Sequence, residues 1–191
     1  LSGQIIFNFF SDATTSAMSA VINNAALIKK VYMPKYLFVI SRVFSSFINL
    51  LASFTALLVV MIATRAELHW KVVFAVIPLG FIVVFSLGVG LLLSALVVKF
   101  RDIMHLYSVF ITALLYLTPV IYPMSSLPYW MQKVVGLNPI TNILMMFRDV
   151  MLYDNFPNLS SILIATIESL AALGIGVYVF YKKQDEFILN I

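Results

Sequence analysis

The sequence predicts an all-α fold, a polytopic bundle of transmembrane helices, on three observations. Hydrophobic residues make up 62% of the 191 residues and charged residues only 10%, against about 25% charged residues in soluble domains. The runs 43–64, 72–98 and 103–132 contain no Asp, Glu, Lys or Arg. Each run is long enough for a helix across the roughly 30 Å hydrocarbon core, which needs about 20 residues. A soluble helix would also need a charged face, and residues 50–63 offer none.

The order of apolar stretches and charge clusters predicts five spans in one transmembrane domain that covers 1–191. We expect them at about 1–22, 37–64, 72–98, 103–121 and 159–181. The chain opens inside an already apolar stretch and lacks the basic flank of a signal peptide. We therefore expect an N-terminally truncated fragment of a longer protein, whose first span here is incomplete.

The basic residues at the ends of these spans predict the sidedness of the chain. Short cytoplasmic loops carry an excess of Lys and Arg, so the richer side is assigned to the cytoplasm together with the C-terminus. Because basic residues are scattered at span ends rather than gathered on one face, the net charge of +4 does not indicate a nucleic-acid partner. The cytoplasmic set is Lys29, Lys30, Lys35, Arg42, Lys99, Arg101, Lys182 and Lys183, and the outer set is Arg65, Lys71, Lys133 and Arg148.

The segment between the first two spans predicts a short amphipathic helix on the cytoplasmic surface. Asn23 or Asn24 can cap its start, and Pro34 disfavours helix at Met33. Such a helix docks a partner protein or lies among lipid headgroups. Its apolar face would hold Leu27, Ile28, Val31 and Tyr32, with Lys29 and Lys30 pointing away.

The segment 118–158 is too apolar for a solvated loop, and its five prolines break it too often for a span. Asn138 followed by Pro139 predicts a capped helix with proline at its first position. A short re-entrant helix in the outer leaflet fits this pattern, either as a lid over a translocation path or as an aromatic anchor at the interface. Its apolar face would hold Ile140, Ile143, Leu144, Phe147 and Met151.

Two carboxylates, Asp12 and Glu168, lie within apolar sequence, where an unpaired charge costs at least about 2.5 kcal/mol. For Glu168 we favour a buried interhelical hydrogen bond over proton coupling, since the middle spans carry no charged residue between their ends. Small residues Ser86, Gly90 and Ser94 share one helix face. They indicate close helix contact, either within the subunit or between subunits.

The sequence lacks the motifs of several kinds of catalytic and binding site. No phosphate-binding loop is present, so ATP hydrolysis by this chain is not expected. His69 and His105 stand alone and the chain has no cysteine, so we expect no metal, no bound cofactor and no enzymatic role. Two classes of protein remain open as alternatives. One is an ion-gradient-driven carrier or lipid flippase, supported by Asp12 and Glu168, and the other is a membrane enzyme for a lipid-linked sugar. The enzyme would depend on the cluster Arg148, Asp149 and Asp154.

Five short motifs occur in an order that extends over nearly the whole chain. They are Asn-Phe-Phe-Ser-Asp-Ala at 8–13, Asn-x-x-Leu-Ile-Lys-Lys-Val-Tyr-x-Pro at 24–34, Phe-Arg-Asp at 100–102, Leu-Thr-Pro-Val-Ile-Tyr-Pro at 117–123, and Asn-Pro at 138–139 followed by Arg148. Together they resemble the permease subunit of ABC type-2 exporters for polysaccharide or polyol phosphate. That group moves lipid-linked O-antigen, capsule or teichoic acid.

The resemblance implies a six-span permease of the bacterial inner membrane that dimerises and pairs with two ATP-binding subunits. ATP and magnesium would be held by those partners, and the substrate would be a lipid-linked glycan. The resemblance implies an ATPase-coupling helix of Asn24, Leu27, Ile28, Lys29, Lys30, Val31 and Tyr32. It also implies an outer gate or glycan path, for which the aromatic and basic candidates are Tyr116, Tyr122, Trp130, Phe147 and Arg148.

Overall fold

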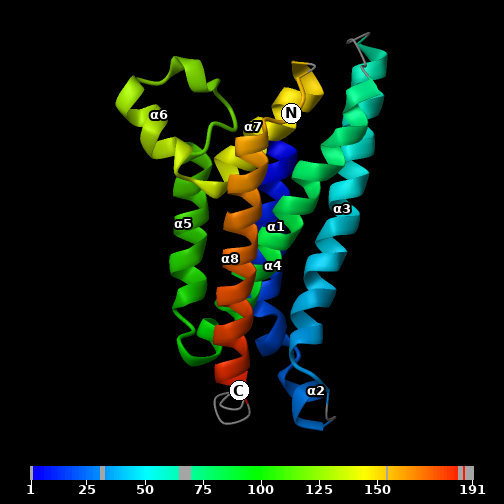
Figure 1. Cartoon of the computed structure of the whole chain (residues 1–191). Helices are drawn as coiled ribbons and strands as arrows, with labels where there is room; N and C mark the ends of the chain where they lie inside the picture. Colours follow the sequence, from blue (N-terminus) through cyan, green and yellow to red (C-terminus); the bar gives the residue numbers. More distant parts are fainter. Residues whose placement is uncertain (1, 31–32, 65–69, 154, 185–186, 188–191) are drawn as a thin grey trace.

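The structure is a computed structural model that describes residues 2–30, 33–64, 70–153, 155–184 and 187, and every regular element in these ranges is a helix. Four helical stretches are long and apolar enough to cross a membrane, and they run side by side (Figure 1). This confirms the predicted all-α membrane bundle. The four are α1 (Ser2–Asn23), α3 (Tyr36–Ala63), the 3-10 helix η1 (Trp70–Ala75) continued by α4 (Val76–Lys99), and α8 (Leu159–Lys183).

The fifth expected span is shorter than the sequence suggested, because α5 covers Ile103–Leu117 and ends four residues before Ile121. Its 15 residues rise about 22 Å, less than the roughly 30 Å of a hydrocarbon core. The helix ends where it does because Thr118 precedes Pro119 and adopts an extended conformation, with φ −92° and ψ 136°.

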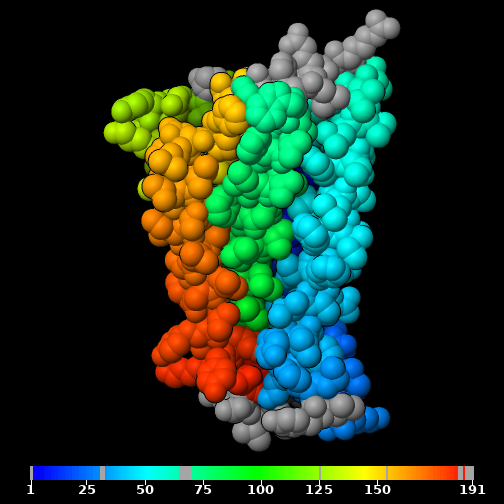
Figure 2. Space-filling model, turned by 45° about the vertical axis from the view of Figure 1, so that its right-hand side comes forward, coloured from blue at the N-terminus to red at the C-terminus, as the bar shows by residue number. Residues whose placement is uncertain are grey.

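Helix α1 lies at the centre of the bundle. It packs against α3, α4 and α5, and α8 packs against α4. Phe10 of α1 stacks on Phe85 of α4 with ring centroids 5.7 Å apart, in the middle of the main hydrophobic core. In Figure 2, α4 is visible between α8 and α3. This order leaves one side of α1 open between α3 and α5.

Small residues set the distances between these helices. A Cβ added to Gly90 would lie 2.7 Å from the Cβ of Ala17 in α1, and Ser86 and Ser94 are fully buried. The small-residue face of α4 that the sequence indicated, with Ser86, Gly90 and Ser94, therefore packs within the subunit. A closer approach joins α4 and α8 at Gly88 and Gly176, where an added Cβ on either glycine would overlap the other helix's main chain.

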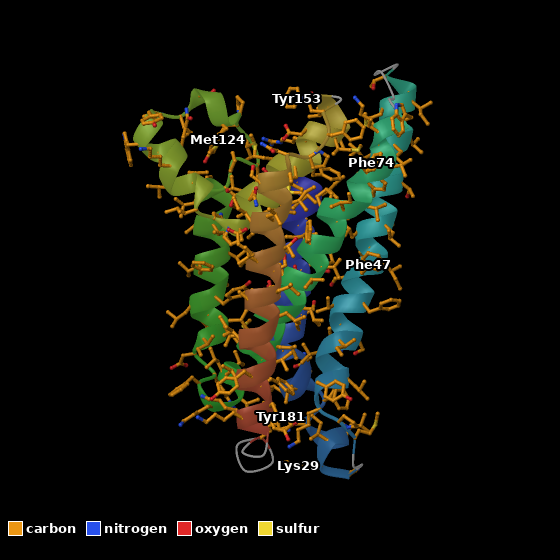
Figure 3. The ribbon with its side chains drawn as sticks, viewed as in Figure 1. Lys29, Phe47, Phe74, Met124, Tyr153 and Tyr181 are labelled. Atoms are coloured by element: carbon orange, nitrogen blue, oxygen red, sulfur yellow. The ribbon has the colours of Figure 1, made fainter. Side chains whose placement is uncertain are left out.

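The two ends of the bundle differ (Figure 1). One end carries α2 (Ala25–Lys30), the connection between α4 and α5, and the end of α8, and Lys29 and Tyr181 lie there (Figure 3). The other end carries η1, the 3-10 helix η2 (Met124–Ser126), α6 (Tyr129–Gly136) and α7 (Pro139–Leu152). Basic residues at the α2 end are Lys29, Lys30, Lys35, Lys99, Arg101, Lys182 and Lys183, and Arg42 lies two turns into α3.

The helix predicted to begin at Asn138 and Pro139 is present as α7, and its re-entrant placement stays a prediction. Asn138 caps it, since its side chain accepts a hydrogen bond from the Ile140 amide at 3.1 Å, and Pro139 is the first helical residue. The predicted apolar face, Ile140, Ile143, Leu144, Phe147 and Met151, is buried throughout.

Candidate functional site

The exposed side of α1 is entirely polar. Its exposed residues are Gln4, Asn8, Asp12, Thr15 and, at the last turn, Asn23. The first four follow one another at helical spacing, so they form a stripe on one face. Hydrocarbon cannot satisfy such groups, and polar side chains within spans therefore face protein or a water-filled cavity.

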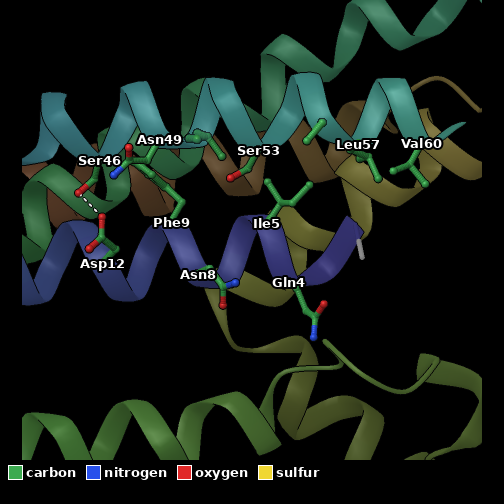
Figure 4. A pocket seen from close by; sticks show the side chains of 12 residues that line it. Gln4, Ile5, Asn8, Phe9, Asp12, Ser46, Asn49, Ser53, Leu57 and Val60 are labelled. Carbon is green, nitrogen blue, oxygen red and sulfur yellow. Dashed lines mark hydrogen bonds between the residues drawn. The ribbon is translucent and has the colours of Figure 1, made fainter. Parts of the chain in front are cut away.

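Helix α3 faces this stripe with polar groups of its own. The Ser46 hydroxyl donates a hydrogen bond of 2.6 Å to Oδ2 of Asp12. Next to this bond, α1 and α3 enclose a pocket of about 460 Å³ (Figure 4). Its polar lining comes from Gln4, Asn8 and Asp12 of α1 and from Ser46, Asn49 and Ser53 of α3.

Helix α5 borders the stripe on the opposite side. The Tyr107 hydroxyl donates a 2.6 Å hydrogen bond to Oγ1 of Thr14 in α1, so these two residues mark where the helices meet. Thr15 follows Thr14, and Ser108 follows Tyr107. In antiparallel helices that face each other, the residue after each contact position turns to the same side. The exposed Ser108, Thr112 and Tyr116 of α5 thus lie on the same side as the α1 stripe.

We call this surface the polar face. Figure 4 shows its arrangement, with α1 between α3 and α5. In contrast, the exposed residues of α8 between Leu163 and Tyr181 are apolar or tyrosine, as expected of a surface in contact with lipid. The polar face comprises Gln4, Asn8, Asp12 and Thr15 of α1, Asn49 and Ser53 of α3, and Ser108, Thr112 and Tyr116 of α5.

The two predicted intramembrane carboxylates have different surroundings. Asp12 is exposed on the polar face, with Ser46 as its hydrogen-bond donor. Glu168 is half-buried on α8, and the Asn142 side chain of α7 lies near its carboxyl group. Its oxygen Oε2 is buried and has no hydrogen-bond partner within the described part of the chain. The interhelical hydrogen bond expected for Glu168 stays a prediction.

The end of the polar face opposite α2 meets the 118–123 connection, which α7 holds in place. The Arg148 guanidinium donates a 2.8 Å hydrogen bond from Nη2 to the Val120 carbonyl, and Asn138 donates one of 3.0 Å to the Thr118 hydroxyl. A Cβ on Gly3 would lie 2.8 Å from Nη2 of Arg148 and 2.9 Å from the Val120 oxygen. These contacts join α7, the 118–123 connection and the start of α1 into what we call the outer clamp.

The predicted aromatic candidates divide between surface and core. Tyr116 and Trp130 are 68% and 66% exposed, and the Tyr122 hydroxyl donates to the Tyr116 carbonyl at 2.8 Å. Phe147 is fully buried and contacts Phe54 edge to face. Its ring therefore packs in the core in this structure, and its expected place along a sugar path stays a prediction. It faces inward because it belongs to the apolar side of α7.

At the other end, α2 divides the predicted coupling residues in a similar way. Leu27 is 45% exposed, while Ile28 is only 8% exposed and packs into the subunit's own core. Asn24 donates its side-chain amide to the Ala20 carbonyl at 2.7 Å, so this side chain caps the end of α1 rather than the start of α2. Lys29 and Lys30 are exposed. Val31 and Tyr32 lie outside the described residues.

The residues considered for enzymatic chemistry lie on or beside α7. Burial raises the pKa of the Asp149 carboxyl. Burial lowers the pKa of the Arg148 guanidinium, and the nearby Tyr153 partly offsets this decrease. Arginine nevertheless stays protonated in proteins, so Arg148 acts as a donor. Asp154 lies outside the described residues. Among those described, no three His, Asp or Glu side chains lie close enough to hold a metal ion.

The sequence analysis missed most of the polar face. It treated Asp12 as an isolated carboxylate and did not connect it with Gln4, Asn8 and Thr15. The signal that would have found them is the helical spacing of uncharged polar residues around that carboxylate.

Sequence similarity to known proteins extends over most of this chain. The sequence model of the ABC-2 type transporter family matches residues 1–152. An O-antigen export system permease protein RfbA of Klebsiella pneumoniae is 23% identical over 189 residues, which cover 98% of this chain and 72% of the relative. The protein of the same name in Myxococcus xanthus is 24% identical over 191 residues, covering 99% and 74%. These similarities include α1, α3 and α5, the helices of the polar face.

Proposed function

The chain belongs to the ABC-2 type transporter family, and from this premise we propose that it is the membrane subunit of an ATP-driven exporter of lipid-linked, O-antigen-type polysaccharide. The relatives named above are O-antigen export permeases, and their similarity extends over nearly the full length of this chain. ATP and its magnesium ion would be held by a separate ATP-binding subunit, as is usual in this family.

The polar face carries the proposal, because it gives a hydrophilic glycan a route past the lipid. Sugar hydroxyls need hydrogen-bond partners at every depth of the membrane, and the face offers amides, hydroxyls and one carboxylate on three helices. A face exposed on one subunit would still meet lipid. A second copy placed opposite would enclose the path, so we propose a homodimer with this face inward.

The distribution of basic residues supports placing α2 and the end of α8 on the cytoplasmic side of the bacterial inner membrane. The outer clamp and α6 then lie at the exit side. In this orientation the glycan would pass from α2 towards Tyr116 and Trp130, whose rings are exposed at the outer end.

Replacing a polar-face serine with leucine is expected to block export. Ser53→Leu removes a hydrogen-bonding group from the path and narrows the pocket between α1 and α3. One lost hydrogen bond is worth about 1.4 kcal/mol, so we expect export to fall about tenfold or more. The measurement is surface glycan in cells that depend on this exporter, normalised to permease in the membrane.

Thr55→Leu is the matched control for this experiment. Thr55 lies two residues further along α3, is equally exposed, and points to the side away from α1, where leucine meets lipid. Its export should stay at the unsubstituted level. Equal export by Ser53→Leu and Thr55→Leu would show that the glycan does not pass along the polar face.

Docking of the ATP-binding subunit is assigned to α2, with Leu27 as its apolar anchor. Leu27 is exposed at the cytoplasmic end of the bundle, and exposed apolar anchors dominate interface energies. Leu27→Asp is expected to reduce the amount of ATP-binding subunit that co-purifies by about tenfold or more, since such an anchor is worth about 2 kcal/mol. Ile28 instead holds α2 against its own subunit.

The comparison variant is Leu37→Asp, at an exposed position in the first turn of α3. It adds the same charge near the same end without touching α2. Normal co-purification with Leu27→Asp would exclude α2 as the docking element, whatever happens to export.

A further inference from the structure

The pocket between α1 and α3 has the size and lining of a binding site rather than of a smooth channel wall. Its volume of about 460 Å³ lies in the range of small-molecule sites. Three polar side chains from each helix converge on it, and the walls between them are apolar, including Ile5, Leu50 and Leu57. An acyl chain would leave the polar groups unpaired, so a ligand with both hydroxyls and C–H surfaces fits better.

We propose that this pocket is a subsite for one neutral sugar residue of the passing glycan, with Asp12 accepting hydrogen bonds from its hydroxyls. The inference rests on the proposed path and adds a specific site to it. Ser46 occupies one carboxylate oxygen of Asp12 at 2.6 Å and holds the group in place. The carboxylate retains acceptor capacity for a sugar hydroxyl.

The amides of Asn8 and Asn49 supply both donors and acceptors on either side of Asp12. Each sugar hydroxyl also donates and accepts, so a ring seated between the two helices finds partners of both kinds. The apolar positions between these groups meet the C–H surface of the ring. The lining thus suits a hydroxyl-rich ring in one orientation.

The charge of the pocket favours neutral residues over anionic ones. Among the described residues, Asp12 is the only charged side chain that lines it. Arg42, the nearest basic residue along α3, lies one turn beyond Ser46 and is not part of the lining. A phosphate or carboxylate entering the pocket would meet a like charge without a compensating cation, whereas a neutral sugar would not.

A single cysteine in the pocket tests the subsite, because these 191 residues contain no cysteine. Ala56→Cys, at a lining position of α3 that makes none of the proposed hydrogen bonds, would be introduced into the full-length permease, with any cysteine elsewhere in the assembly replaced. The permease, assembled with its ATP-binding subunit in lipid nanodiscs, is then labelled with N-ethylmaleimide. Labelling is followed with maltotetraose, a neutral probe, or with tetragalacturonate, an anionic one. At about ten times its dissociation constant, maltotetraose should slow labelling about tenfold, and tetragalacturonate should leave the rate unchanged.

Asp12 variants in the same background connect this result to the carboxylate. Asp12→Asn keeps a hydrogen-bonding group and removes the charge, so both probes should then slow labelling. Asp12→Ala should abolish protection by either, with assembly checked by co-purification of the ATP-binding subunit. Ile48→Cys, on the exposed apolar side of α3, serves as the position where neither probe should act.

The possible failures are distinguishable. If Ala56→Cys is labelled but both probes protect equally, or neither protects, the neutral-sugar subsite is wrong while the path stands. If neither N-ethylmaleimide nor a sulfonated thiol reagent reaches Ala56→Cys, the path itself fails.

Discussion

Gly176→Ala is expected to prevent assembly of the folded permease. The added methyl group would overlap the main chain of Gly88 across the α4–α8 contact, and two main chains cannot move apart without separating the helices. Overpacking of a well-packed core typically costs about 1–3 kcal/mol, and we expect a cost at the upper end because main chain, not a side chain, must move. About 3 kcal/mol is a large share of the stability of a typical domain. We expect almost no permease to survive extraction in mild detergent as a monodisperse species.

Gly174→Ala is the control on the same helix. Gly174 is exposed and has no neighbouring atom within 4 Å of an added Cβ. Alanine there should be neutral or stabilise the helix by up to about 1 kcal/mol. The thermal midpoints of both variants, followed by fluorescence-detected size-exclusion chromatography, provide the comparison. Equal midpoints would show that α4 and α8 do not approach at these glycines.

Arg148→Ala is expected to abolish export by releasing the outer clamp. The variant removes the guanidinium that donates a hydrogen bond to the Val120 carbonyl. Hydrogen bonds to charged groups are worth about 1.5–3 kcal/mol. Of the hydrogen bonds that Asn138 and Arg148 make to the 118–123 connection, only the one from Asn138 would then remain. Because the connection lies against the start of α1 at Gly3, we expect loss of the ordered exit with smaller effects on the spans.

The control for the clamp is Lys133→Ala, which removes an exposed basic residue of α6 that lies 4.7 Å from the ring centroid of Tyr129. Surface glycan and membrane levels are measured for both variants. Arg148→Ala should lose export at a normal membrane level, and Lys133→Ala should keep it. Export by Arg148→Ala at the unsubstituted rate would show that the clamp does not shape the exit.

The sequence predicted best where a local rule decides the structure. Asn138 and Pro139 begin a helix through a cap and a fixed φ, so α7 begins where expected. The uncharged runs predicted the long helices because a bilayer requires about 20 apolar residues. The end of α5 was missed, although Pro119 already restricts Thr118 to extended conformations, because hydropathy alone continues to Ile121.

Packing between helices was harder to predict from the sequence. Helix α4 is apolar on all sides, so its composition does not distinguish the side facing α8 from the side facing α1. Both Gly88 and Gly90 are small, and only the arrangement of helices shows that Gly88 meets α8 and Gly90 meets α1. For the same reason, the pairing of Arg148 with Val120 joins two motifs whose relation the sequence does not reveal.

The polar face shows a further limit of reading one helix at a time. The stripe on α1 is visible in its sequence, but its meaning depends on α3 and α5, which contribute Asn49, Ser53 and Thr112 to the same side. The polar face is thus a surface that no single span carries.

The most direct test of the glycan path is the reactivity of single cysteines with a sulfonated, membrane-impermeant thiol reagent. Cysteines are placed at Asn8 and Ser53 on the polar face and at Thr55 on the opposite side of α3, in the full-length exporter. A thiol in water forms the reactive thiolate, whereas one in hydrocarbon does not. We predict that Asn8→Cys and Ser53→Cys react at least about tenfold faster than Thr55→Cys. Equal rates, or faster labelling at Thr55→Cys, would contradict the polar face as the path of the glycan.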